Sequence, residues 1–357
     1  MRIAQLIDSL DTGGAERMAV NYANALAIEE FSALVATRRE GPLRDQVGNK
    51  VSYLFLNRKH TFDFAALIRL KKFIKSNKID LVHAHSTSFL LAVLLKFIYP
   101  KIKIIWHDHY GNSEFLGQRK SLILKLSSVF FSGAIGVNSK LVSWGLKNLN
   151  CRNIIYLPNF VTDIPVDEQN PVRLNGIPGK RIICLANLRP QKGHLMLLEV
   201  AEKLKKKHPE WTFHLVGKDF KDEYSEQLIS AISSKGLENN VFIYGAMTEI
   251  KGILQQSDIG ILTSRSEGLP VALLEYGLYK LPVVCTGVGE IPQILNPDNG
   301  FLIDSGDAEA FYNAIHTLIT DNKLREKISA SFNIFINANF AQNAVLDKYI
   351  NWAKTLL

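Results

Sequence analysis

The chain has 357 residues, of which 47% are hydrophobic and 21% are charged, a composition typical of a folded globular protein and not of a disordered one. Its most apolar stretch, residues 89–99, is too short to span a bilayer, and residues 1–10 are too short and too polar for a signal peptide, so neither an anchor nor a leader is expected. The net charge of +8 is uneven, since residues 1–160 carry +11 and residues 161–357 carry −3.

Three cysteines, Cys151, Cys184 and Cys285, lie far apart and lack the paired spacing of a zinc site. Two of them lie in apolar, strand-like runs, which predicts reduced thiols in a core. Reduced thiols favour a cytoplasmic protein.

The first half of the chain alternates short apolar runs with helical segments. Residues 2–8 are expected to form a strand, followed by a polar loop with Gly13 and Gly14 and a helix at residues 17–28. Further strands are expected at residues 32–37, 51–56, 79–84, 102–106, 134–137 and 153–157. This alternation predicts a mostly parallel sheet with helices on both faces and ligand sites at the carboxyl ends of its strands. The first loop lacks the GxGxxG spacing of dinucleotide dehydrogenases, which argues against hydride transfer.

Histidines gather at the ends of two of these strands. His83 and His85 follow one apolar run, while His107 and His109 flank Asp108 after the next. Imidazole and carboxylate groups are ordinary zinc ligands, so a metal site is one interpretation. We do not expect a metal, because residues that alternate along a strand end do not by themselves converge on one ion.

Lysines adjoin apolar residues in three segments of the first half, residues 67–78, 94–105 and 119–131. Basic residues on an amphipathic face draw a protein to anionic lipid headgroups, by about 1 kcal/mol per charge. Peripheral contact with an anionic membrane is therefore one interpretation, and solvated helix faces are the other. Nucleic acid is not an expected partner, because the aromatic residues are not interleaved with the basic ones.

The chain is expected to form two domains, residues 1–162 and 181–338, joined by a proline- and glycine-containing linker at residues 163–180 and followed by a helix at residues 339–357. Strands of the second domain are expected at residues 181–185, 212–217, 241–245 and 258–263. The loop after the first of these carries Arg189 and Lys192. Two cations on a strand-to-helix loop can neutralise a diphosphate.

Residues 264–277 combine a polar loop, a helix start and two carboxylates. Gly268 permits a tight turn, and Pro270 is expected as the first helical residue. Glu267 on the loop could reach a sugar, and Glu275 in the helix could accept hydrogen bonds from a vicinal diol. A glycine loop before a helix N-terminus presents free N–H groups and about half a positive charge, which suits a phosphate. On spacing alone, an equally good interpretation is that both glutamates are simply solvated.

An ordered set of motifs resembles the retaining family-4 glycosyltransferases, also called glycosyl transferases group 1. The motifs are GGAER at residues 13–17, LPNF at 157–160, LRPQKG at 188–193, the Glu267–Glu275 pair, LPVVC at 281–285 and TGVGEIPQI at 286–294. They cover essentially the whole chain. The resemblance implies an α/β protein of the GT-B fold, with two Rossmann-like, doubly wound domains facing each other across a cleft and a C-terminal helix returning to the first domain.

The resemblance also implies a site. Glu275 is expected to bind the ribose, and Lys192 and Arg189 the diphosphate, with Arg189 replacing an arginine that the family usually has at Asn187. His109 takes the place of the family's active-site histidine, with His107 as the alternative, and Glu267 positions the sugar. Further donor or acceptor contacts are expected from Gly13, Gly14, Asn187, Gly268, Leu269 and Pro270, and base contacts from residues 245–248.

The implied activity is a retaining hexosyl transfer from a nucleotide-diphosphate sugar, UDP favoured over GDP, to a glycan or lipid-linked glycan in bacterial polysaccharide biosynthesis. EGLP and NLRPQKG are similar to the surface-polysaccharide members. Neither a metal nor another cofactor is implied, because cationic side chains replace the metal. A cytoplasmic enzyme, peripheral at the inner face of the membrane, is expected. The alternatives are a GT-B nucleotide-sugar epimerase, which needs no acceptor, and a non-catalytic sugar-nucleotide binding module.

Overall fold

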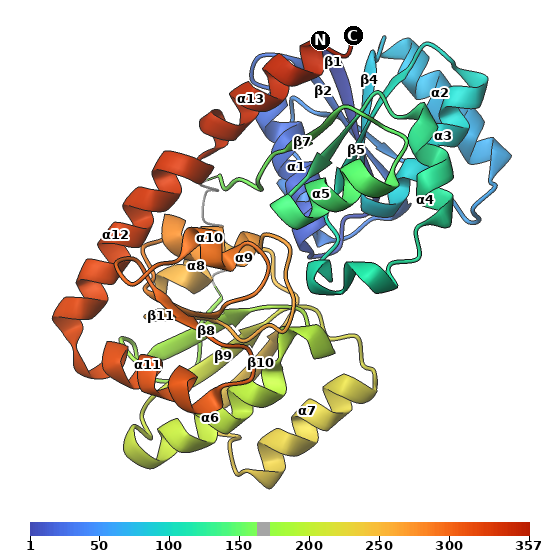
Figure 1. Ribbon diagram of the computed structural model, residues 1–357. Helices are drawn as coiled ribbons and strands as arrows, with labels where there is room; N and C mark the ends of the chain where they lie inside the picture. The colour runs from blue at the N-terminus through green and yellow to red at the C-terminus, as the bar shows by residue number, and fades with distance from the viewer. Residues whose placement is uncertain (163–171) are drawn as a thin grey trace. The chain divides into compact units, whose positions relative to one another are not determined.

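The computed structural model describes residues 1–162 and 172–357, and it divides into two compact units (Figure 1). Unit 1 comprises Met1–Phe160 and Gln342–Leu357, and unit 2 comprises Val161–Ala341. Part of the expected linker, residues 163–171, lies outside the described residues. The part that follows packs on unit 2, because the Arg181 guanidinium donates hydrogen bonds to the carbonyl oxygens of Leu174 and Asn175.

Unit 1 contains a seven-stranded parallel sheet in the order β3-β2-β1-β4-β5-β6-β7. Its strands are β1 (Arg2–Ser9), β2 (Phe31–Arg39), β3 (Ser52–Phe55), β4 (Leu81–His85), β5 (Lys103–Asp108), β6 (Gly133–Gly136) and β7 (Ile154–Tyr156). All the strands expected in this half are present. The strand order reverses between β1 and β4, and ligands of such sheets bind beyond the carboxyl ends of the strands at that point.

Helices cover both faces of this sheet. They are α1 (Gly14–Leu26), α2 (Phe64–Ser76), α3 (Phe89–Ile98), α4 (Leu122–Ser127), α5 (Ser139–Asn148) and α13 (Gln342–Lys354), with 3₁₀ turns η1 (Pro42–Gln46), η2 (Ser86–Ser88), η3 (Ser113–Gln118) and η4 (Ser128–Phe130). Successive side chains of a strand point to opposite faces. One face, with Val82 and Ile104, packs in an apolar core with α2, α3 and α4. The alternate residues face α1 and α13. They include apolar residues such as Ile7 and Leu34, which pack on α1, and buried polar residues such as His83.

The last helix, α13, packs along unit 1 (Figure 1, red). It begins at Gln342, because the preceding helix ends at Phe340 and Ala341 is extended, with φ −64° and ψ 148°. The Tyr349 ring lies 5.0 Å from that of Tyr22 on α1. Gly133 of β6 makes room for Trp352, since a Cβ there would lie 2.6 Å from the indole ring.

Unit 2 contains a six-stranded parallel sheet in the order β10-β9-β8-β11-β12-β13. The strands are β8 (Arg181–Leu185), β9 (Thr212–Val216), β10 (Val241–Gly245), β11 (Ile259–Leu262), β12 (Val283–Thr286) and β13 (Phe301–Ile303). The helical segments are η5 (Pro190–Lys192), α6 (His194–Lys207), α7 (Glu223–Ser234), α8 (Ile250–Gln255), α9 (Val271–Leu278), α10 (Ile291–Ile294), α11 (Ala308–Thr320) and α12 (Asn322–Phe340). The strands expected from the sequence did not include β12, and β13, which is three residues long, was not expected either.

Tyr276 of α9 joins this helix to two strands of the unit 2 sheet. Its buried hydroxyl accepts a hydrogen bond from Leu185 N at 2.7 Å and lies 3.3 Å from the carbonyl oxygens of Ile183 and Ile261. The ring occupies the space where a Cβ of Gly260 would be. The position of α9, and of the loop that precedes it, is therefore fixed over β8 and β11. Among the residues described, no helix has both the length and the hydropathy needed to cross a bilayer.

Candidate functional site

Three strand-end loops meet at the carboxyl edge of the unit 2 sheet, those after β8, β11 and β12. Gly193 has φ +68°, and a Cβ there would overlap the carbonyl oxygen of Thr263. Gly289 has φ +62°, and its Cβ would overlap the carbonyl oxygens of Glu267 and Gly268. Only glycine fits both the conformation and the space at these two positions. The three loops are therefore in backbone contact.

Lys192 and Glu267, both predicted as site residues, come from two of these loops and form an ion pair. Lys192 Nζ lies 2.6 Å from Glu267 Oε1, and the Ser264 hydroxyl donates to the same oxygen, also at 2.6 Å. The Glu267 side chain is 5% exposed and that of Lys192 is 23% exposed. Burying a carboxylate is costly unless it is paired and hydrogen-bonded, and these two contacts meet that requirement. The pair places one accessible ammonium group at a strand-to-helix loop.

Ser264 was missed as a site residue. The available signal was its spacing, because Ser264-x-x-Glu267 places a hydroxyl three residues before a carboxylate, a separation at which local side-chain hydrogen bonds form. Ser264 is fully buried, and its carbonyl oxygen accepts a hydrogen bond from the Thr286 hydroxyl at 2.6 Å. It therefore connects Glu267 to β12.

Other predicted donor residues have different surroundings. Asn187 Oδ1 accepts a hydrogen bond from Lys218 N at 2.7 Å, which braces the loops after β8 and β9. Arg189 is exposed, and its guanidinium lies 4.4 Å from the centre of the Phe220 ring. Glu275 is half-buried on α9.

The start of α9 differs from the expectation at one residue. Pro270 has φ −71° and ψ 121°, so it precedes the helix as its N-cap and is not the first helical residue. Gly268 and Leu269 lie before it, both buried, and the Gly268 carbonyl oxygen accepts a hydrogen bond from Glu290 N at 3.0 Å. This contact joins the loop after β12 to the predicted phosphate loop.

Four histidines form a compact square in unit 1. His83 Nε2 and His107 Nδ1 lie 3.1 Å apart, and His85 Nδ1 and His109 Nε2 lie 3.0 Å apart. The His83 and His85 rings stack with centres 4.3 Å apart, and the His107 and His109 rings lie 3.9 Å apart with their planes tilted by 34°. Three of the rings are fully buried, and His109, at the carboxyl end of β5, is half-buried.

Burial keeps these imidazoles neutral. It lowers the pKa values of His83, His85 and His107 well below the ordinary value, and that of His109 to about 3. Neighbouring histidines lower the first three further.

The expectation that these histidines would not converge is wrong for three of them. His83, His85 and His107 offer ring nitrogens within 4.8 Å of one another, and a neutral imidazole is the form that binds a metal. The Asp108 carboxylate does not belong to this group of ring nitrogens. The Arg119 guanidinium donates two hydrogen bonds to it, of 2.6 and 2.9 Å. A hydrogen bond joins His83 to His107, and stacking joins His85 to His83.

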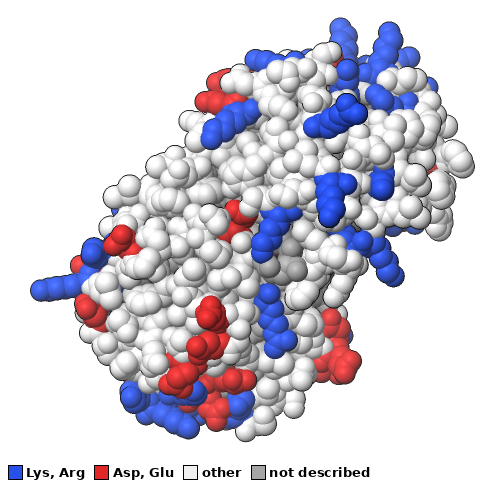
Figure 2. Space-filling model, in the orientation of Figure 1, with Lys and Arg blue, Asp and Glu red and all other residues white. Residues whose placement is uncertain are grey.

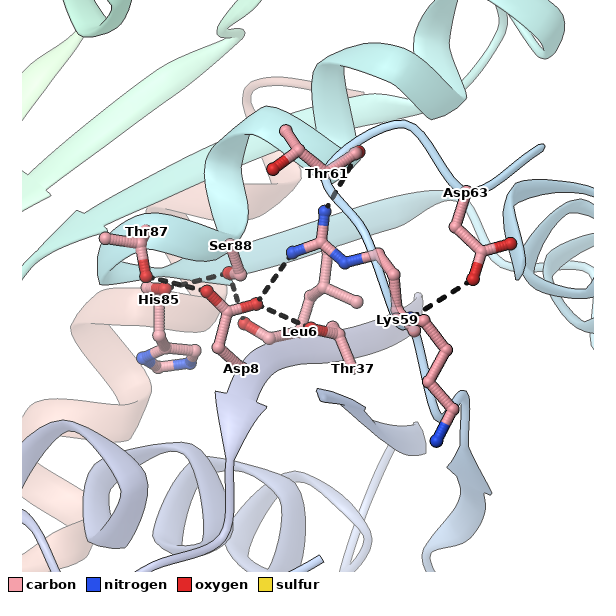
Figure 3. Close-up of polar contacts among 10 residues, drawn as sticks. Leu6, Asp8, Thr37, Lys59, Thr61, Asp63, His85, Thr87 and Ser88 are labelled. Atoms are coloured by element: carbon pink, nitrogen blue, oxygen red, sulfur yellow. Dashed lines mark hydrogen bonds and ion pairs between the residues drawn. The ribbon is translucent and has the colours of Figure 1, made fainter. Parts of the chain in front are cut away.

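Sequence reasoning also missed Asp8, which ties together the carboxyl ends of β1, β2 and β4 (Figure 3). Its carboxylate accepts hydrogen bonds from the hydroxyls of Thr37 at 2.5 Å and Thr87 at 2.7 Å, and from the Arg58 guanidinium at 3.3 Å. Nearby, Gly13 is extended and precedes α1, and Gly14 is its exposed first residue. No sequence motif connects Asp8 with Arg58, since only the sheet brings them together.

Comparisons with known proteins match both units. Residues 12–162 match the family model described as Glycosyltransferase Family 4, and residues 169–331 match that described as Glycosyl transferases group 1. An uncharacterized glycosyltransferase of Haemophilus influenzae is 26% identical over 334 residues, covering 89% of this chain and 90% of the relative. The UDP-Gal:alpha-D-GlcNAc-diphosphoundecaprenol alpha-1,3-galactosyltransferase of Escherichia coli is 25% identical over 377 residues, covering 95% of each chain.

Among solved structures, Anabaena Alr3699/HepE in complex with UDP-glucose is similar over 100% of this chain and 99% of its own, with a TM-score of 0.80 and 18% identity. At that identity the likeness shows the fold. Together with the two parallel α/β sheets, it confirms the expected GT-B fold class.

The buried histidines predict a loss of stability in mild acid. Their folded-state pKa values lie below the unfolded value of about 6.5, so the unfolded chain binds more protons once the pH falls below that value. The free energy of unfolding should then fall by about 1.4 kcal/mol per pH unit for each such histidine. Urea denaturation at pH 7.5, 6.5 and 5.5 measures this slope. His107→Leu should reduce this slope by about 1.4 kcal/mol per pH unit, the contribution of one histidine. His60→Leu, at an exposed position, should leave the slope unchanged. Equal slopes in the wild-type protein and in both variants would contradict the assignment.

Proposed function

Because the chain belongs to the glycosyltransferases of family 4 and group 1, we propose that it moves a hexosyl group from a UDP-sugar to a hydroxyl of a glycan or lipid-linked glycan. The names of the similar proteins support this choice, since the Escherichia coli relative uses UDP-Gal and a diphosphoundecaprenol-linked sugar, and Alr3699/HepE binds UDP-glucose. The observation that carries the proposal is the Lys192–Glu267 pair at the carboxyl edge of the unit 2 sheet.

In this proposal unit 2 holds the donor. Lys192 stabilises the negative charge that develops on the departing diphosphate, and the first N–H groups of α9 add a partial positive charge. Glu275 binds the ribose hydroxyls, and Arg189 assists at the diphosphate after leaving the Phe220 ring. Glu267 holds Lys192 in place and contacts the sugar. His109 contributes a contact to a sugar hydroxyl.

The anomeric configuration is retained. The acceptor hydroxyl attacks from the face that the diphosphate leaves, its oxygen forms the bond to the anomeric carbon as the bond to the leaving phosphate breaks, and that phosphate takes the acceptor's proton. No covalent enzyme intermediate is needed. Lys192 and the helix N-terminus supply the positive charge that a divalent metal supplies in other transferases.

A donor screen tests this proposal. UDP-sugars should raise the melting temperature more than GDP-sugars do, because a ligand that binds only the folded state adds about 2.7 kcal/mol at 100 times its Kd. The same shift should survive EDTA. Transfer is then measured with the best donor and a lipid-linked acceptor, by mass and by the configuration of the product. A changed nucleotide sugar released without acceptor would instead identify an epimerase, and an inverted product would contradict retention.

Loss of the ion pair should abolish most of the transfer. Lys192→Ala and Glu267→Ala should each lower kcat by about two to three orders of magnitude, as when one charge-stabilising group is removed from an active site. Glu267→Gln keeps an acceptor for Ser264 and removes only the charge, so it separates electrostatics from packing. Lys203→Ala is the control, since Lys203 pairs with Glu309 on the α6–α11 surface. Turnover near the wild-type rate in the Lys192 or Glu267 variants would rule out this site.

We also propose that unit 1 contacts an anionic membrane through an apolar surface formed by Phe97, Leu122, Ile123, Leu126 and Val129. These side chains are 61–73% exposed, and the Phe97 ring lies 4.9 Å from that of Phe130, which joins α3 to η4. Lys120 and Lys125 adjoin the surface and are exposed. Blue side chains also outweigh red ones over unit 1 in Figure 2. Apolar side chains beside lysines fit a bilayer with anionic headgroups.

Liposome sedimentation tests the membrane surface. The triple substitution Leu122→Ser, Ile123→Ser and Leu126→Ser should weaken binding to vesicles containing phosphatidylglycerol by at least about tenfold, because it removes most of the apolar contact. The matched control is Ile229→Ser with Ile334→Ser, two residues of unit 2 that are 54% and 71% exposed. Binding that is equal in both variants, or independent of anionic lipid, would refute the assignment.

A further inference from the structure

A line of three polar side chains crosses the interior of unit 1 and ends at His109. Gln5 of β1 is fully buried, and its Oε1 lies 2.8 Å from Nε2 of His85 on the neighbouring strand β4. The other ring nitrogen of His85, Nδ1, lies 3.0 Å from Nε2 of His109. His85 is also fully buried. The line therefore runs from the middle of the sheet to its carboxyl edge.

The direction of each hydrogen bond follows from the chemistry of its acceptor. An amide oxygen only accepts, so Nε2 of His85 must carry a hydrogen. Burial keeps His85 neutral, which leaves Nδ1 with a lone pair and no hydrogen. Nε2 of His109 must then be the donor, and since His109 is neutral as well, its Nδ1 carries only a lone pair.

This order depends on which end of the Gln5 amide faces His85. The structure places the oxygen there, with Oε1 2.8 Å from Nε2 of His85. The amide nitrogen is buried and forms no hydrogen bond with the residues that the structure describes. The reversed amide would place an N–H group against Nε2 of His85 and would reverse the tautomers of both histidines.

Among the residues that the structure describes, no carboxylate is hydrogen-bonded to His109. Asp108, its neighbour in the chain, points to the opposite face, as successive residues of a strand do, and is held there by Arg119. A histidine backed by a carboxylate is stabilised as the imidazolium, whereas one backed by a neutral imidazole and an amide is not. The adjacent His107 ring, also neutral, adds no charge.

We propose that Gln5 and His85 are positioning residues that fix His109 as the Nε2–H tautomer, so that its Nδ1 accepts a hydrogen bond from a sugar hydroxyl. The contact between His109 and the sugar rests on the proposed function, whereas the tautomer is a property of the free protein. His109 is then a neutral acceptor in the reaction and transfers no proton.

Nitrogen NMR of the full-length protein with ¹⁵N-labelled histidine tests the tautomer directly, with His109→Asn used to assign the signals. At pH 7 the free protein should show a protonated Nε2 and a bare Nδ1 at His109. Gln5→Met, which has no acceptor, should turn this into a mixture of tautomers. Gln5→Glu keeps an acceptor oxygen toward His85, so it should keep Nε2 of His109 protonated, while its added carboxylate should raise the pKa of His85.

Kinetics separate positioning from packing. Gln5→Met should lower kcat about tenfold, the order seen when a partner that orients a functional histidine is lost. Gln5→Glu, which keeps the acceptor oxygen toward His85, should recover most of kcat. A protonated Nδ1 at His109 in the wild-type protein, or a wild-type NMR pattern in Gln5→Met despite reduced kcat, would overturn the proposal. Both results concern the tautomer alone, so they leave the glycosyltransferase proposal standing. Absence of transfer with every UDP-sugar would overturn that proposal and the role of His109 while leaving the tautomer measurable.

Discussion

A parallel sheet covered on both faces is the constraint on which both units of this protein depend. Parallel strands are joined by crossover connections, so all of them run in the same direction. Every strand therefore ends at the same edge of the sheet, where its loop begins. In unit 2 that edge collects the loops carrying Lys192, Glu267 and Gly289. The loops of the proposed site therefore lie where backbone N–H groups and helix starts are concentrated, and the rest of the sheet supports them.

Close contact between loops is possible in unit 2 because two glycines leave room for backbone. Gly193 and Gly289 lie against carbonyl oxygens that any side chain would overlap. This proximity allows a buried carboxylate, Glu267, to be satisfied by a lysine from one loop and a serine from its own. An unpaired carboxylate at the same depth would be strongly unfavourable. The ion pair and the glycines thus depend on each other.

Unit 1 handles buried polarity differently. Its polar residues beneath α1 and α13 are imidazoles, an amide and phenols, which can all remain uncharged. Neutral groups avoid most of the desolvation penalty of a buried ion and still form directional hydrogen bonds. Packing of α13 over this cluster connects the end of the chain with the interior of the sheet. The opposite face of the sheet packs in the apolar core with α2, α3 and α4. Other apolar side chains of α3 and α4 lie outside this core and are exposed.

The sequence alone determined the alternation of strands and helices, the family and the loops that carry Lys192 and Glu267, because hydrophobic periodicity and short motifs are local properties. It did not reveal β13, whose three residues are too few to show a period. Only the tertiary structure decided which polar residues meet. Gln5 reaches His85, Asp8 reaches Arg58, and four histidines form a square because strand order and register bring distant segments together. Those contacts depend on the pairing of strands across the sheet, which no single stretch of sequence specifies.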